Sequence, residues 1–160
     1  MEQNLTFADL GLSAEVLQAL EQKGYGYPTK IQAEAIPPFM EWKDVIAKAP
    51  TGTGKTFAFG IPMIEHIDAD SEDLQGLILA PTRELAIQIG DELRGLLTFS
   101  KKIRVAVVYG GAKIEGQIRQ LQNHPQIVVA TPGRLMDHYK RRTLTLDKVQ
   151  TVVLDEADRM

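Results

Sequence analysis

The sequence predicts an α/β protein: a parallel β-sheet flanked by helices. Short runs of valine, isoleucine and leucine recur along the 160 residues, and helix-sized segments separate them. The runs lack alternation of apolar and polar residues, which indicates strands buried on both faces. Polar turn residues follow the runs, as expected where strands of an open parallel sheet end. The predicted strands are residues 45–47, 77–80, 105–108, 127–130 and 152–154.

Two helices are predicted before the first strand. Ser13 can cap a helix whose apolar residues, Val16 and Leu20 among them, share one face. A turn rich in glycine and tyrosine, residues 24–28, leads to a second helix that begins at Thr29.

Composition and charge limit the classes of function. A chain of 160 residues fits one domain, so we predict a single domain over residues 1–160. The net charge of −3 provides no broad positive field, so any nucleic-acid binding must come from local geometry. The absence of cysteine excludes disulfides, thiolate metal sites and a cysteine nucleophile. The polar, acidic start and the short apolar runs predict a cytoplasmic protein without a membrane partner.

Residues 49–56, APTGTGKT, carry the first chemical motif. They follow a predicted strand and precede a predicted helix over 57–66, and they match the phosphate-binding loop except for alanine at the usual first glycine. Lys55 would reach the β and γ phosphates of a nucleotide, and the Thr56 hydroxyl would hold Mg²⁺. The alternative, an ordinary glycine- and threonine-rich surface loop, fits the strand and helix on either side less well. The predicted phosphate contacts are Thr51, Gly52, Thr53, Gly54, Lys55 and Thr56.

A pair of carboxylates follows the last predicted strand. Asp155 would position Mg²⁺, and Glu156 would activate the water that attacks the γ phosphate. An Asp-Glu pair after a strand is by itself usually a solvated turn, and the phosphate loop makes the catalytic interpretation the better one. Lys55, Asp155 and Glu156 are therefore the predicted catalytic residues.

Residues 155–158 spell DEAD, and the chain resembles the amino-terminal RecA-like domain of DEAD-box RNA helicases. The resemblance runs from about Phe7 to Met160 and includes several motifs in the family's order. It implies a RecA-like domain that binds ATP and Mg²⁺, within a protein that unwinds or remodels RNA duplexes.

Residues 24–32, GYGYPTKIQ, resemble the family's adenine-recognising motif, with Phe7 as its upstream aromatic residue. By this resemblance Gln32 bonds the adenine edge, Tyr25 stacks on the ring and the Tyr27 backbone lies beside the base. An amide offers both a donor and an acceptor, which suits adenine and mismatches guanine. The family more often has phenylalanine where Tyr25 stands. Without the other motifs, a capped helix with Gln32 on its surface would be the simpler interpretation.

Three strand-end turns resemble the family's RNA-contacting elements. On residues alone they could equally be ordinary strand-to-helix turns. Two of them place a threonine at a helix N-cap, and Pro132 would be a first helical residue. Free backbone amides and two arginines would then contact the RNA backbone with little sequence preference. The predicted RNA contacts are Pro81, Thr82, Arg83, Gly110, Gly111, Thr131, Pro132, Gly133 and Arg134.

The resemblance also implies parts that this chain lacks. A strand ending in Ser-Ala-Thr and a second RecA-like domain follow in the family, so the sheet is expected to be incomplete at its carboxyl end. That second domain carries arginines whose contribution is typically about 10³–10⁵-fold, so hydrolysis and unwinding by this chain alone should be negligible. Unpaired central strands are costly and prone to association, so we expect the gap to be filled by another segment or by another copy of the chain, or the sheet to close up.

Other functions stay open. A P-loop DNA translocase or small-molecule kinase would share the phosphate loop, although no substrate lid for a kinase is evident. A catalytically silent RNA-binding module is disfavoured by the intact Lys55, Thr56, Asp155 and Glu156. The three histidines lack metal-ligand spacing and are expected to be structural or surface residues.

Overall fold

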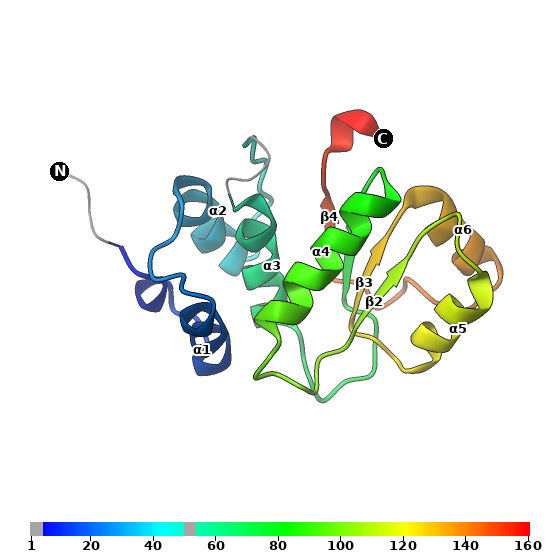
Figure 1. The fold of residues 1–160 in the computed structure, drawn as a ribbon, viewed down its shortest axis with the longest axis horizontal. Coiled ribbons are helices and arrows are strands. Elements are labelled where there is room, and N and C mark those ends of the chain that lie inside the picture. The colour runs from blue at the N-terminus through cyan, green and yellow to red at the C-terminus, as the bar shows by residue number, and fades with distance from the viewer. Residues whose placement is uncertain (1–4, 50–53) are drawn as a thin grey trace. The chain divides into compact units, whose positions relative to one another are not determined.

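The computed structural model describes residues 5–49 and 54–160 (Figure 1). These residues belong to two compact units. One unit contains the described residues up to His66, together with Gly95–Lys101. The other contains Ile67–Arg94 and Lys102–Met160. Within residues 5–49 and 54–160, no helix combines the length and apolar character needed to cross a membrane.

The first unit is helical, and side-chain caps begin α1 and α2. Ser13 Oγ accepts a hydrogen bond from the Val16 amide at 3.4 Å and opens α1. Thr29 caps α2 and exchanges hydrogen bonds with Gln32 in a capping box. The helix after the phosphate loop begins at Lys55, two residues before the predicted start. The elements are η1 (Phe7–Leu10), α1 (Ala14–Gln22), α2 (Lys30–Met40) and α3 (Lys55–His66).

The second unit contains a four-stranded parallel sheet in the order β2-β3-β1-β4. Its strands are β1 (Gly76–Leu79), β2 (Val105–Val108), β3 (Ile127–Ala130) and β4 (Thr151–Leu154). The predicted positions of these four strands are confirmed to within one residue at each end. The central strand β3 is buried along its whole length, as the prediction of strands covered on both faces requires.

Helices cover the two faces of this sheet: α4 (Arg83–Leu96), α5 (Ile114–Gln122) and α6 (Pro132–Lys140). Leu121 of α5 and Leu135 of α6 belong to one apolar cluster with Ala106 and Val128 of the sheet. On the opposite face, Gly90 of α4 lies so close to Val107 that an added Cβ would collide with it. The α/β class with helices on both faces is therefore confirmed.

The prediction of a strand at residues 45–47 is wrong. Residues 43–49 form neither helix nor strand, and the Ile46 side chain is 94% exposed. A strand is stable only when a neighbour satisfies its backbone N–H and C=O groups. The short apolar run indicated β propensity, but the sheet of the described residues ends at β4 and does not include this segment.

The prediction that every strand is buried on both faces is wrong for β4. Val152 and Leu154 are each 55% exposed. Within the described residues, β4 pairs with β1 alone and is an outer strand of the sheet. The alternating exposure along β4 is typical of a strand that is covered on one face only.

Candidate functional site

The turns after the four strands lie at one edge of the sheet. Beyond the strand ends, three backbone hydrogen bonds continue the ladder: Ala80 N–H to Ala130 O at 2.9 Å, Thr131 N–H to Val108 O at 3.1 Å, and Asp155 N–H to Leu79 O at 3.0 Å. All predicted RNA-contacting turns and the Asp155–Glu156 pair therefore share the carboxyl edge, where ligands bind in open parallel sheets.

The turn after β1 contains Pro81, Thr82 and Arg83. Thr82 Oγ1 accepts from the Leu85 amide at 3.2 Å, so the predicted N-cap is confirmed. Thr82 and Arg83 are exposed. The guanidinium carbon of Arg83 lies 5.1 Å from the centre of the Tyr109 ring, which connects this turn to the next one.

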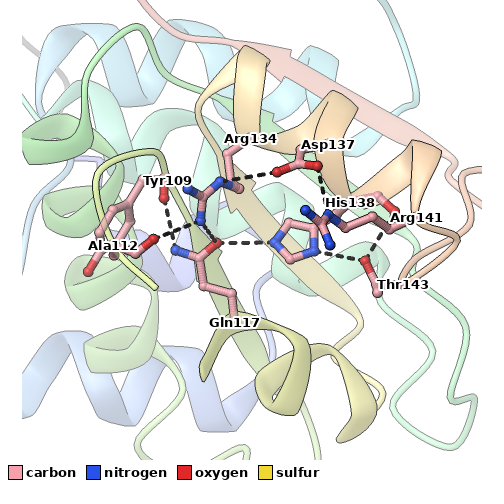
Figure 2. Close-up of polar contacts among 8 residues, drawn as sticks. All are labelled: Tyr109, Ala112, Gln117, Arg134, Asp137, His138, Arg141 and Thr143. Atoms are coloured by element: carbon pink, nitrogen blue, oxygen red, sulfur yellow. Dashed lines mark hydrogen bonds and ion pairs between the residues drawn. The ribbon is translucent and has the colours of Figure 1, made fainter. Parts of the chain in front are cut away.

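The turn after β2, Tyr109–Ala112, presents Gly110 and Gly111 to solvent. Gly111 has φ +85°, a left-handed conformation that favours glycine. Both ends of the turn are held by side chains (Figure 2). Gln117 Nε2 donates to Tyr109 O at 2.9 Å, and Arg134 Nη1 donates to Ala112 O at 3.1 Å.

The turn after β3 opens α6, with Pro132 as the first helical residue, as predicted. Gly133 is exposed. Thr131 stands at the N-cap, but its side chain makes no capping hydrogen bond, so the prediction of a capping threonine is wrong here. Its backbone instead joins the β2 end through Val108, as described above. Arg134 is predicted to offer its charge to the RNA backbone, but its side chain is only 14% exposed.

Behind these turns lies a polar network that sequence reasoning missed (Figure 2). Gln117 Oε1 lies 3.0 Å from Arg134 Nη1 and 3.1 Å from His138 Nε2. His138 Nδ1 lies 2.8 Å from Thr143 Oγ1. One signal was available: Gln117 stands three residues after Ile114 and four before Leu121, at a core position of its helix.

Burial and neighbouring charges set the ionisation of this network. Burial of His138 lowers its pKa, and the nearby Arg134 guanidinium lowers it further. The hydrogen bond from Arg141 lowers the pKa of Asp137, with burial acting in the opposite direction. His138 is thus neutral and Asp137 ionised near neutral pH. The expectation that the histidines are structural or surface residues holds for His138 in that it is fully buried.

The two carboxylates that follow β4 differ in environment. Asp155 is 5% exposed, so its carboxylate lies within the protein at the carboxyl edge. Glu156 adopts a left-handed backbone conformation, φ 50° and ψ 48°, which is uncommon for a residue with a side chain. Such conformations concentrate at functional sites, which is consistent with the predicted role of Glu156.

The predicted adenine-recognition residues lie in the first unit. Gln32 is 3% exposed, so the simpler interpretation of a surface glutamine is wrong. Its Oε1 accepts from the Thr29 amide at 2.9 Å, and its Nε2 donates to Gly54 O at 3.0 Å. Tyr25 is 51% exposed and meets Phe57 edge to face, with ring centres 5.5 Å apart, whereas Tyr27 is 66% exposed.

The phosphate loop is described from Gly54 onward, and Thr51, Gly52 and Thr53 lie outside the described residues. Gly54 has φ +81°, and Lys55 and Thr56 form the first residues of α3. Amides at a helix N-terminus favour anions, so these residues suit a phosphate. Lys55 and Thr56 belong to the first unit and Asp155 and Glu156 to the second, and their convergence on one nucleotide stays a prediction.

Residues 29–160 match the family model described as DEAD/DEAH box helicase. The chain belongs to this family. It is 52% identical over 155 residues to the DEAD-box ATP-dependent RNA helicase CshA of Bacillus cereus (strain ATCC 10987 / NRS 248), covering 97% of this chain and 29% of that protein. It is 53% identical over 156 residues to the ATP-dependent RNA helicase CshA of Limosilactobacillus reuteri, covering 98% of this chain and 31% of that one.

A solved structure supports the same placement. The chain is similar to the crystal structure of a DEAD box protein from the hyperthermophile Methanococcus jannaschii, with a TM-score of 0.88 and 44% identity. The match covers 97% of this chain and 42% of that one. The RecA-like fold implied by the DEAD-box resemblance is thereby confirmed. The chain spans 29–31% of the length of the two curated relatives named above.

Proposed function

We propose that residues 1–160 form the amino-terminal, ATP-binding RecA-like domain of an ATP-dependent RNA helicase. The whole protein would couple ATP binding and hydrolysis to unwinding or remodelling of RNA duplexes. One observation carries the proposal. Three turns with exposed residues share a single sheet edge with Asp155, which is buried. The names of the curated relatives, which are RNA helicases, support it.

Gln32 would select adenine. Its amide oxygen accepts one bond from Thr29 and its amide nitrogen donates one to Gly54. Each of these atoms has capacity for a second hydrogen bond, one as acceptor and one as donor. That pair complements the edge of adenine and opposes that of guanine. Tyr25, braced by Phe57, would stack on the base, with the Tyr27 backbone beside it.

The residues around the phosphates fit a magnesium nucleotide. The Thr56 hydroxyl and the Asp155 carboxylate are oxygen ligands of the kind that Mg²⁺ prefers, directly or through water. A bound Mg²⁺ would neutralise charge on the phosphate oxygens. Lys55 would bind the β and γ phosphates, and Glu156 would orient and deprotonate the attacking water.

RNA would lie along the carboxyl edge of the sheet. Arg83 supplies an exposed positive charge, and Gly110, Gly111 and Gly133 supply exposed backbone amides. Such groups bind phosphates and sugars, so the preference for particular base sequences should be weak. Contacts to the 2′-hydroxyl would distinguish RNA from DNA. A second RecA-like domain, elsewhere in the complete protein, would complete both sites. We place this activity in the cytoplasm.

The test measures ATP hydrolysis by the full-length polypeptide with RNA or with DNA of matched sequence. RNA is expected to stimulate hydrolysis and DNA is not. Glu156→Gln should lower the RNA-stimulated rate by at least about 10²-fold, the usual contribution of a general base. Equal stimulation by DNA would indicate a DNA translocase. RNA binding without hydrolysis in the wild type would indicate a silent binding module.

A separate variant tests the adenine assignment. Gln32→Glu keeps an acceptor for the Thr29 amide, so the start of α2 should stay intact. A carboxylate cannot donate to Gly54 O or to adenine, so the affinity for ATP should fall about tenfold and the preference over GTP should disappear. Nucleotide titration measures both, with the exposed Gln22→Glu as the control for added charge. Retained ATP preference would contradict the assignment.

A further inference from the structure

Gln117 is a buried polar residue that joins two of the turns at the carboxyl edge. Its side chain lies between the Tyr109–Ala112 turn and α6, and the residue is 4% exposed (Figure 2). Three groups bond its amide: Tyr109 O, Arg134 Nη1 and His138 Nε2. The amide belongs to the unit that carries the proposed RNA surface, and it lies beneath that surface.

Donor and acceptor chemistry determines the hydrogen-bond directions around the Gln117 amide. Tyr109 O can only accept, so the nitrogen of the Gln117 amide faces it and the oxygen faces the other way. Arg134 and His138 must then both donate to that oxygen, which places a proton on His138 Nε2. The Thr143 hydroxyl lies 2.8 Å from His138 Nδ1 and 3.1 Å from His138 O, and its single proton can be donated to only one of them. Donation to Nδ1 leaves the ring neutral, with its one proton on Nε2.

Arg134 extends the network to the far end of the turn. The same Nη1 atom that donates to Gln117 also donates to Ala112 O at 3.1 Å. Its Nε lies 3.9 Å from Asp137, whose other oxygen is bonded to Arg141 at 2.8 Å. The Arg134 side chain is thus held from several sides and is directed into the protein.

We propose that Gln117 is a positioning residue for RNA binding, acting with His138 behind it. Gln117 fixes Tyr109 O directly and Ala112 O through Arg134, and so sets the orientation of the Gly110 and Gly111 amides between them. It also connects this turn to the first turn of α6, so that both contact the RNA backbone as one rigid surface. This inference rests on the proposed function, since it concerns how the RNA surface is built.

The experiment uses the full-length protein and the substitution Gln117→Met, which preserves side-chain length without hydrogen bonds. The control is Gln120→Met, one turn along α5, whose amide oxygen accepts from the Val107 amide at 3.2 Å, a partner on strand β2 and not in the turn. In RNA-stimulated ATP hydrolysis, the RNA concentration for half-maximal rate should rise about tenfold in Gln117→Met, equivalent to about 1.4 kcal/mol. The ATP concentration for half-maximal rate and the rate at saturating RNA should match the wild type.

Other outcomes overturn the inference. If the RNA requirement of Gln117→Met matches that of Gln120→Met, the residue does not position the RNA surface. If the RNA and ATP requirements and the maximal rate all worsen together with thermal stability, Gln117 has only a structural role. A wild type that binds no RNA would instead remove the proposed function itself.

A milder variant keeps the test decisive if Gln117→Met does not fold. Thr143→Val preserves shape and removes the hydroxyl that contacts both His138 Nδ1 and His138 O. The RNA requirement should then rise about threefold, the effect of losing one neutral hydrogen bond, with the ATP requirement unchanged. A wild-type RNA requirement in Thr143→Val would overturn the role of His138 and, where Gln117→Met fails to fold, the inference as a whole.

Discussion

Arg83 and Arg134 occupy comparable places after neighbouring strands, yet the structure directs their side chains differently. Arg83 is exposed and lies over the Tyr109 ring. Arg134 is 14% exposed and bonds Ala112 O and Gln117 Oε1. A strand-end arginine in the sequence predicts available charge, but only Arg83 offers that charge to solvent. In the proposed RNA surface, Arg134 would therefore act through the turn that it holds.

At the residue scale, the two adjacent glycines should respond differently to alanine. Gly111→Ala forces a side chain into a left-handed conformation, which should lower the free energy of unfolding by about 1–2 kcal/mol. An added Cβ at Gly110 meets no atom within 4 Å, so Gly110→Ala is the matched control. Chemical denaturation compares the two variants, and equal stability would contradict a left-handed Gly111.

His138 gives a prediction for pH dependence. Burial first, and the charge of Arg134 second, hold its folded pKa below the ordinary value of 6.5; Arg141 acts in the same direction and Asp137 opposes them. Its remaining polar contacts, Gln117 and Thr143, are uncharged. The unfolded chain therefore takes up the proton at higher pH than the folded protein does. The contribution of neutral His138 to the free energy of unfolding is therefore complete above about pH 6.5, the pKa in the unfolded chain. It is lost as the pH falls towards the folded pKa.

Chemical denaturation at several pH values between about 7 and 5 measures the free energy of unfolding. Uptake of one proton on unfolding lowers this free energy by at most about 1.4 kcal/mol per pH unit. His138→Gln should flatten the decline. An unchanged slope in His138→Gln would show that the buried imidazole is not the group responsible.

At the scale of elements, β3 and β4 show how pairing decides burial. Both are short runs of β-branched residues, so their sequences predict the same environment. β3 lies between β2 and β1 and is buried throughout. Among the described residues β4 has β1 as its sole partner, and two of its apolar side chains face solvent. The position of a strand in the sheet, which depends on distant segments, sets its exposure.

The exposed β4 predicts association of the 160-residue polypeptide. An outer strand with apolar side chains favours pairing with another chain. Sedimentation should show an average mass that rises with protein concentration, and Val152→Thr combined with Leu154→Thr should reduce this rise. Tyr139→Ser, on α6, removes a comparably exposed apolar residue and serves as the control. A concentration-independent monomer would contradict the prediction.

At the scale of the whole molecule, a negative net charge is compatible with binding a negatively charged ligand such as RNA. The net charge of −3 excludes a broad positive field, although the relatives are RNA helicases. The second unit offers a local alternative, because its strand-end turns place Arg83 and exposed glycine backbone along one edge. Backbone amides bind phosphates without adding net charge, so an acidic domain can still contact RNA.

The sequence by itself determined the α/β class, the strands β1 to β4, the caps at Ser13 and Thr82, the start of the second helix near Thr29, and the family. These features depend on neighbours within a few residues, through periodicity, capping and turn chemistry, and such short-range signals are present in any single sequence. Tertiary structure alone decided that residues 45–47 stay outside the sheet and that Gln117, Arg134 and His138 meet under the Tyr109–Ala112 turn. Backbone pairing and burial require partners far along the chain, and no local pattern specifies which partners those are.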